Sequence, residues 1–401
     1  MAQSRTSTLI GCCALLVWVP FSGCGSDSQD ESGGGTGGTS GTGGTGGTSG
    51  TGGAGGTGGA TGGFGGATGG TAGASGGTGG AAGGTGGAAG GASGSGGSTD
   101  PVELVVGAST AYLDSDLAVD DTHAYFSFDP GFTSDPQAVR RVSVAGGSTE
   151  TIGSVDNPFG IATTDSYVFF GSHDGLQRWS KGGGSAEVVA TQTGIDSAVA
   201  DDTAVYFASA YFGSGVVGSF SLTDGTTTTL AMVNSPASLA LGGSGQLFVL
   251  DVGSAGNCSD VNVWSVPRDG SAQASQLASG QDGSSGLGAD AAHVYWVASC
   301  EDGIWRVPID GGTAELFQTN DANQLTIHAG FLYWTEPAAF PTKGGFVQRV
   351  STTGGAVETL AEIGNVTGFG EPDPTPDRIA VAGGFVYWTN PGGGVWRVAI
   401  P

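Results

Sequence analysis

The stretch FLYWTEPAAFPTKGGFVQRVSTTGGAVETL, residues 331–360, contains one copy of a pattern that recurs from about residue 101 to the C-terminus. A strand centred on Tyr333-Trp334 leads through a loop to a further strand at Gln348-Arg349-Val350. A turn with two glycines, Thr353-Gly354-Gly355, then precedes another strand. Glycine suits a hairpin turn of this kind because it adopts a positive φ at no steric cost. The stretch therefore predicts strands joined by turns.

Pairs of large apolar residues like Tyr333-Trp334 recur at intervals of 37 to 54 residues. This interval is close to the length of one four-stranded propeller blade. Each pair follows a short apolar strand and a tight turn, and the region contains no amphipathic helical stretch. The seven pairs, which predict seven blades, are Tyr125-Phe126, Phe169-Phe170, Tyr206-Phe207, Phe248-Val249, Tyr295-Trp296, Tyr333-Trp334 and Tyr387-Trp388.

The two ends of the repeat region complement each other. The seventh unit stops at Pro401 after its third strand, whereas Val102-Glu103-Leu104-Val105-Val106 matches the fourth-strand pattern with no blade before it. Pairing of that segment with the strand at Val395–Ile400 would close the ring. We therefore predict an all-β, seven-bladed β-propeller over residues 101–401, closed by strands from both termini.

The units resemble the YWTD repeats of low-density-lipoprotein-receptor-type propellers over roughly residues 102–401. The residues that carry the resemblance are Tyr333-Trp334-Thr335-Glu336 and Tyr387-Trp388-Thr389-Asn390. Propellers of that family typically have six blades, and their Asp after Thr is Glu336 or Asn390 here. NHL-type propellers and bacterial lipoproteins are similar too. The resemblance implies a propeller and no catalytic residue.

The N-terminus has the pattern of a processing signal. Arg5 precedes an apolar run, Leu9–Phe21, that is short for a spanning helix. The following Phe21-Ser22-Gly23-Cys24 resembles the bacterial lipobox, which implies a lipoprotein signal peptide at residues 1–23 and lipidation of Cys24. An ordinary secretory peptide is the alternative. In the lipoproteins that this pattern resembles, Asp after the cysteine implies retention in the inner membrane. Because Gly25 follows here, the resemblance favours the outer membrane or cell surface over the inner membrane.

Residues 24–100 form a linker between this signal and the repeats. Residues 33–98 are almost entirely Gly, Thr, Ala and Ser. Such a segment cannot bury enough apolar surface to offset its ordering entropy. We predict a disordered tether with an end-to-end distance of roughly 45–50 Å.

The formal net charge is −25, from 36 acidic and 11 basic residues. This balance excludes sequence-independent nucleic-acid binding, which needs cations to neutralise phosphates. It also disfavours docking onto anionic lipid, so we expect membrane contact through the lipid anchor alone. The acidity indicates either simple solubility or an affinity for cationic ligands or divalent ions. We expect a monomer.

Strand connections in a propeller alternate between two faces. The long loops, which we place at 127–138, 208–215, 251–260 and 335–345 within blades and at 153–160, 279–286 and 363–377 between blades, share the face that we call the loop face. The opposite turn face holds the tight turns. Long loops on a rigid scaffold carry function, and acids beside aromatics suit a protein, peptide, glycan or cationic partner. The candidate ligand-face residues are Asp116, Phe128, Phe132, Asp135, Phe159, Tyr211, Phe212, Glu336, Phe340 and Phe369.

Two cysteines remain in the repeat region. Cys258 and Cys300 fall in the second-to-third loops of adjacent blades on the loop face. Outside the cytoplasm an even pair is typical of a disulfide, and a bond here would stabilise the fold by roughly 4 kcal/mol. Free buried thiols are the alternative.

The chain is not expected to be an enzyme. His123, His293 and His328 lie near the turn face, and His173 on the loop face has no nucleophile partner. The inner-strand starts, where some propeller enzymes hold a metal, read Asp116, Gly160, Ser197, Ser238, Gln324 and Arg378. Asp114 with Asp116 could hold calcium, but two carboxylates do not make a site, so no cofactor is expected. The sequence favours an envelope binding module, with an envelope-assembly scaffold or a hydrolase or lyase with a channel metal as alternatives.

Overall fold

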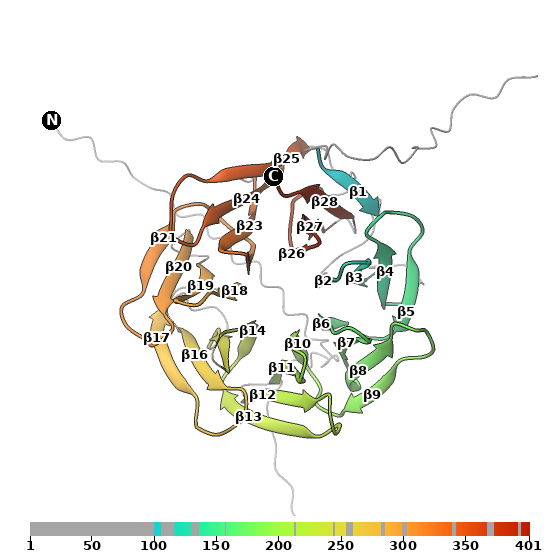
Figure 1. Ribbon diagram of the computed structural model, residues 1–401, viewed down its shortest axis with the longest axis vertical. Coiled ribbons are helices and arrows are strands. Elements are labelled where there is room, and N and C mark those ends of the chain that lie inside the picture. Colours follow the sequence, from blue (N-terminus) through green and yellow to red (C-terminus); the bar gives the residue numbers. More distant parts are fainter. Residues whose placement is uncertain are drawn as a thin grey trace, which may run out of the picture. The chain divides into compact units, whose positions relative to one another are not determined.

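The computed structural model describes residues 100–105, 116–129, 136–156, 158–211, 214–243, 245–253, 260–281, 285–298, 303–338, 342–366, 373–391 and 394–401. The described residues form seven four-stranded antiparallel sheets arranged as blades around a central axis (Figure 1). No helix occurs among them, and none therefore that could span a membrane. The predicted seven-bladed, all-β fold is confirmed. The predicted signal peptide, Cys24 and nearly all of the tether lie outside the described residues.

Blades 1 to 3 follow one another along the chain, each from its innermost to its outermost strand. Blade 1 contains β2 (Leu117–Val119), β3 (His123–Phe128), β4 (Ala138–Ser143) and β5 (Glu150–Ser154). Blade 2 contains β6 (Phe159–Thr163), β7 (Tyr167–Ser172), β8 (Gly175–Ser180) and β9 (Glu187–Ala190). Blade 3 contains β10 (Ile195–Ala200), β11 (Ala204–Tyr211), β12 (Ser214–Ser221) and β13 (Thr227–Val233).

Blades 4 to 6 repeat this order, and blade 7 combines both ends of the ring. Blade 4 contains β14 (Pro236–Leu241), β15 (Gln246–Asp251), β16 (Val261–Pro267) and β17 (Ser275–Gln281). Blade 5 contains β18 (Ser285–Ala289), β19 (His293–Ala298), β20 (Gly303–Pro308) and β21 (Glu315–Gln318). Blade 6 contains β22 (Gln324–His328), β23 (Phe331–Pro337), β24 (Lys343–Ser351) and β25 (Glu358–Val366). Blade 7 contains β26 (Ile379–Ala382), β27 (Phe385–Thr389), β28 (Val395–Ala399) and β1 (Val102–Val105).

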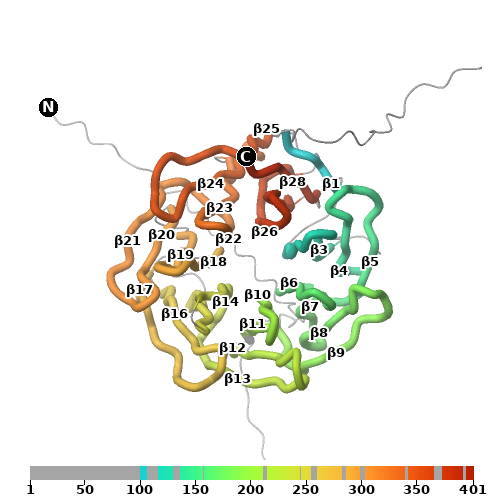
Figure 2. Tube along the Cα trace, viewed as in Figure 1, coloured from blue at the N-terminus to red at the C-terminus, as the bar shows by residue number. Residues whose placement is uncertain are grey.

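The ring closes as predicted, by pairing of the two ends of the repeat region. β1 lies antiparallel to β28, with Val102 opposite Arg397 and Glu103 opposite Trp396. Figure 2 shows this contact between the first and last coloured segments of the chain. Leu104 on β1 is buried in a cluster with Phe126 of blade 1. The closing strand therefore completes blade 7 and also packs against the next blade.

The recurrent apolar pairs form the core between blades. Neighbouring residues of a strand point to opposite faces of the sheet, so each member of a pair packs against a different neighbouring blade. Tyr333 packs with Trp388 of blade 7, whereas Trp334 packs with Tyr295 of blade 5. These side chains are at most 1% exposed. The pair is thus the element that joins each blade to both neighbours, which explains why the pattern recurs in all seven units.

The connection in blade 3 differs from the prediction. Residues 208–215 were expected to form a long loop, but β11 runs to Tyr211 and β12 begins at Ser214, directly opposite it. The small residues before Tyr211 continue the strand because they pair with the glycine and valines of β12. The loop expected at 335–345 is also shorter, since Pro337 already pairs with Gly345.

On the turn face, a carboxylate at the first turn of a blade fixes that turn and its second strand. Asp120 accepts hydrogen bonds from the backbone N–H groups of Thr122 and His123, and from the Tyr125 hydroxyl at 2.9 Å. Lys181 of blade 2 lies 2.6 Å from the same carboxylate. Asp201 in blade 3 and Asp290 in blade 5 repeat the turn and tyrosine contacts.

Within the described ranges, four blades carry an ion pair across their two outer strands. The arginine lies on the third strand and also packs over an aromatic ring. The glutamate lies on the outermost strand and is more than half exposed. Charged side chains on an edge strand discourage pairing with other chains. The pairs are Arg141–Glu150, Arg178–Glu187, Arg306–Glu315 and Arg349–Glu358.

Candidate functional site

The loop face contains the starts of the inner strands and the ends of the second strands. Of the ten predicted ligand-face residues, the side chains of Asp116, Phe128, Phe159 and Glu336 are described there, as is the backbone of Tyr211. The others stay predictions because they lie outside the described residues, as do both cysteines of the predicted disulfide: Phe132, Asp135, Phe212, Phe340, Phe369, Cys258 and Cys300.

Asp116 connects two blades. Its carboxylate accepts hydrogen bonds from its neighbour Leu117 N–H at 2.9 Å and from Ile161 N–H of blade 2 at 2.7 Å. Its own N–H donates to the Ser127 hydroxyl at 2.7 Å. Both carboxylate oxygens therefore bind backbone of the fold. This arrangement favours a structural role for Asp116 over calcium or ligand binding.

Two more of the predicted channel positions lie where neighbouring blades meet. The Ser197 hydroxyl accepts a hydrogen bond from Leu239 N–H of blade 4 at 3.2 Å. Gly160 has φ +59°, and a Cβ there would lie 3.0 Å from Ile195 and Ser197 of blade 3. Across the described part of the chain, no three His, Cys, Asp or Glu side chains lie together as metal ligands would.

Phe128 and its neighbours close the base of the blade 1 loop. The guanidinium carbon of Arg140 lies 3.4 Å from the centroid of the half-buried Phe128 ring. Asp129 accepts a hydrogen bond from Gln137 Nε2 at 2.9 Å, across the loop. Phe128 therefore presents a ring that a cation of the protein already covers on one side.

Glu336 lies near the end of β23 in blade 6, close to Asn320 and Asp321. Its carboxylate accepts a hydrogen bond from Asn320 Nδ2 at 3.1 Å. Partial burial, and to a smaller extent the like charge of Asp321, raise the pKa of Glu336 above its ordinary value. The ionised form of Glu336 is thus less stable here than it would be in water.

The hairpin that carries Glu336 is held against the segment before blade 7. Thr335 donates from its hydroxyl to the Asp377 carbonyl at 2.6 Å, and Gly344 N–H donates to the Thr375 hydroxyl at 3.1 Å. Lys343 Nζ lies 3.3 Å from an Asp373 carboxylate oxygen. These contacts tie the hairpin that carries Glu336 to the segment that leads into β26.

Asp196 is a loop-face carboxylate that the sequence analysis missed. The register of β10 shifts between Ile195, opposite Ser209, and Ser197, opposite Ala208, so Asp196 is the extra residue of a bulge. The side chain of Asp196 keeps contact with solvent. The strand that carries it, β10, nevertheless belongs to the inner ring of strands (Figure 1). Desolvation by the surrounding protein raises the pKa of Asp196 to about 6, and the Ala210 N–H offsets part of this effect. In the sequence, the signal for this site was an acidic residue near the start of a predicted inner strand.

The carboxyls whose pKa departs from its ordinary value divide between the two faces according to the direction of the shift. Among the described residues, the carboxyls with a raised pKa, Asp196 and Glu336, lie on the loop face. On the turn face, burial also acts to raise the pKa of carboxyl groups. Hydrogen bonds to these carboxylates have a larger effect than burial, so their pKa is lowered. The carboxyls with a lowered pKa are Asp120, Asp201, Asp224, Asp269 and Asp290.

Comparison with known proteins supports the fold. No protein-family model matches the chain, and no curated protein matches it. A solved structure of a catalytically inactive virginiamycin B lyase from Staphylococcus aureus with quinupristin is 15% identical, with a TM-score of 0.54. A selenomethionine-substituted virginiamycin B lyase from the same organism is 13% identical, with a TM-score of 0.52. Each match covers 75% of this chain and 99% of that chain.

A nidogen/laminin complex is also similar, at 15% identity and a TM-score of 0.39, covering 62% of this chain and 81% of that one. Identities this low show the fold alone. The chain is a seven-bladed β-propeller.

Proposed function

We propose that this chain is a cell-envelope lipoprotein, anchored at Cys24, whose propeller binds a protein, peptide or glycan partner through its loop face. A seven-bladed propeller suits a protein-binding module, because rigid sheets hold the loops of one face in a fixed array. The fold also occurs in enzymes, so the assignment depends on the chemistry of the site and not on the fold.

The observation that carries this proposal is the difference between the carboxylates of the two faces. Turn-face acids are stabilised by the protein's own hydrogen bonds and cations, whereas Asp196 and Glu336 are anions that the fold leaves under-stabilised. Carboxylates of the second kind gain most from an added cation or hydrogen-bond donor. The partner therefore presents ammonium, guanidinium or N–H groups to this face.

The sequence supports the envelope part of the proposal. Residues 1–23 have the pattern of a lipoprotein signal, residues 24–100 that of a tether, and residues 101–401 contain the propeller. A tether of this length favours a surface binding module over a scaffold subunit, because a subunit of an assembly needs little reach. We also propose the Cys258–Cys300 disulfide, which would join the loops of blades 4 and 5.

We expect the double substitution Asp196→Asn with Glu336→Gln to reduce partner binding at least about tenfold at pH 7, because one charge-assisted hydrogen bond contributes about 1.5–3 kcal/mol. The full chain is immobilised, an envelope extract is passed over it, and the captured partner is quantified. Asp224→Asn with Asp269→Asn is the control, since it removes the same charge from the turn face. Equal losses in both variants would contradict a loop-face site.

Capture should also depend on pH. The pKa of Asp196 is raised to about 6, so its carboxyl is ionised at pH 7 and protonated at pH 5. A cationic partner therefore binds more weakly as the pH falls through 6. Capture by the Asp196→Asn variant should lack this transition.

A propeller hydrolase or lyase is the second candidate. The observation that favours it is again Asp196, because a carboxyl with a pKa of about 6 can exchange protons near neutral pH. Metal analysis of the purified chain separates the two candidates. A stoichiometric ion that is lost on Asp196→Asn substitution would favour the enzyme, and a metal-free chain that still captures its partner would favour the binding module.

A further inference from the structure

We propose that the outer edge of blade 3 is a second interaction surface, which takes an extended segment of a partner protein as an added strand. The segment pairs with the free edge of β13, places apolar side chains in the groove beside it, and carries basic residues on its other face. This surface lies on the rim of the ring and is separate from the loop-face site.

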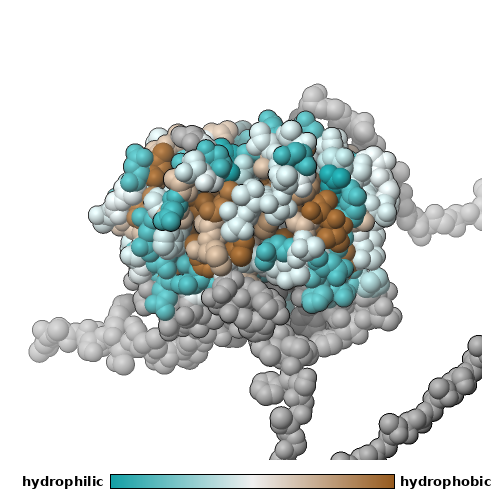
Figure 3. Space-filling view, turned by 90° about the horizontal axis from the view of Figure 1, so that it is seen from below, coloured by the Kyte–Doolittle hydropathy of each residue, from teal (hydrophilic) through white to brown (hydrophobic). Residues whose placement is uncertain are grey.

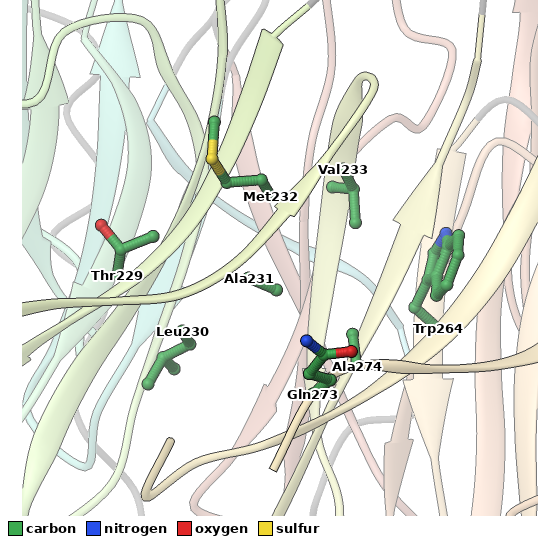
Figure 4. A pocket seen from close by; sticks show the side chains of 8 residues that line it. All are labelled: Thr229, Leu230, Ala231, Met232, Val233, Trp264, Gln273 and Ala274. Atoms are coloured by element: carbon green, nitrogen blue, oxygen red, sulfur yellow. The ribbon is translucent and has the colours of Figure 1, made fainter. Parts of the chain in front are cut away.

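A groove of about 400 Å³ lies between β13 and blade 4. Leu230, Met232 and Val233 on β13 line one side, and Trp264 and Gln273 of blade 4 line the other (Figure 4). Met232 is 71% exposed, the largest value among the exposed large hydrophobic residues described. Figure 3 views the ring from the side on which β12 and β13 lie in Figure 1, and hydrophobic residues appear on that rim.

Trp264 forms part of the wall of this groove. Its indole nitrogen is buried, so Trp264 contributes apolar ring surface to the groove.

The edge of β13, beside this groove, lacks the charged pair that discourages pairing with another strand in four other blades. In blades 1, 2, 5 and 6 the outer strand carries a glutamate that pairs with an arginine of the third strand. The matching positions in blade 3 are Ser219 opposite Thr228, and in blade 4 Ser265 opposite Ser275. β13 is seven residues long and contains no charged residue. A long, uncharged, partly apolar edge is the kind that accepts an added strand.

The surrounding charge determines what kind of strand fits. Residues 195–281, which make up blades 3 and 4, contain seven acidic residues and one basic residue, Arg268. Arg268 is already paired with Asp201. This sector therefore attracts a segment with lysine or arginine. It repels a second copy of the chain, whose net charge is −25.

The probe for this surface is the labelled peptide acetyl-KVKVKVK-amide, in which valines alternate with lysines. Its control is the same peptide with alternate backbone nitrogens methylated, so that one edge cannot donate hydrogen bonds. When the full chain is titrated with the parent peptide, binding should be saturable and at least about tenfold tighter than for the methylated peptide. The reason is that the methylated peptide lacks three backbone hydrogen bonds, whose combined free energy exceeds that of a tenfold change in affinity. Equal affinities would overturn strand addition.

Substitutions on two different outer strands test where on the molecule the peptide binds. Met232→Lys should weaken binding of the parent peptide at least about tenfold, whereas Leu316→Lys, the same change at a 44% exposed residue of β21, should leave it unchanged. Ser219→Arg with Thr228→Glu rebuilds the ion pair of four other blades and should also abolish the preference for the parent peptide. If Met232→Lys and this double variant bind normally, β13 is not the site.

Two further measurements separate this surface from the alternatives. The loop-face substitution Glu336→Gln, which keeps all seven acidic residues of 195–281, should leave peptide binding intact, so failure of the proposed function would not affect this result. A loss of peptide binding in that variant would overturn the proposal of a separate surface. Light scattering that shows a dimer abolished by Met232→Lys would make a second copy the occupant and would also overturn the proposal.

Discussion

Deletion of residues 101–105 is expected to destabilise the propeller by about 4 kcal/mol or more. The deletion removes β1, leaves the backbone edge of β28 unpaired, and exposes the side that Leu104 covers. Loss of one buried leucine costs about 2–5 kcal/mol on its own. Urea unfolding followed by circular dichroism measures the change.

The control for this deletion is the removal of five residues, 51–55, from the predicted tether. We expect that variant to unfold at the same urea concentration as the unaltered chain, because a segment of this composition contributes no packed core. A Δ101–105 chain as stable as the control would mean that β1 does not close the ring.

The substitution Asp120→Ala is expected to cost about 3 kcal/mol at pH 7. It removes the acceptor for two backbone N–H groups and for the Tyr125 hydroxyl. It also leaves Lys181, whose side chain is 18% exposed, without its partner. Each lost contact to a charged group costs about 1.5–3 kcal/mol, and these losses are not additive. Asp121→Ala, at the exposed neighbouring position, should change stability by less than about 0.5 kcal/mol.

The Asp120 effect should depend on pH in a defined direction. Burial opposes ionisation, but hydrogen bonds from Lys181 and Thr122 outweigh it and hold the pKa of Asp120 well below its ordinary value of 3.8. A carboxyl with a lowered folded-state pKa stabilises the fold above its unfolded-state pKa, and that stabilisation is lost as the pH falls further. The difference in the free energy of unfolding between Asp120→Ala and the unaltered chain is therefore largest at pH 6–8 and becomes smaller below about pH 4. A gap that stays constant down to pH 2 would contradict this account.

The fold was predictable because its signals are local and repeated. Each apolar pair lies on one strand, each Gly-Gly turn lies within three residues, and the unmatched strand at each end of the repeats indicated closure. The strand boundaries in blade 3 were not predictable in this way. Small residues before Tyr211 are equally compatible with a loop, and only their partners on β12 make them strand.

The candidate site was less predictable because it depends on contacts between blades. Asp116 is acidic and lies at an inner-strand start, as predicted, yet Ile161 of the next blade uses its carboxylate. Asp196 owes its raised pKa to desolvation by the protein around it, which does not appear in its own segment of sequence. Phe132, Asp135, Phe212, Phe340 and Phe369 stay predictions.

On the loop face the pKa values of Asp196 and Glu336 are raised, whereas on the turn face those of Asp120, Asp201 and Asp290 are lowered. An NMR titration of the side-chain carboxyl carbons in the isotopically labelled chain tests this claim directly. Asp196 should titrate with a midpoint at about pH 6 and Glu336 above 4.5, whereas Asp120, Asp201 and Asp290 should titrate below 3.8. An Asp196 midpoint at or below 3.8, with no difference between the two faces, would contradict the account.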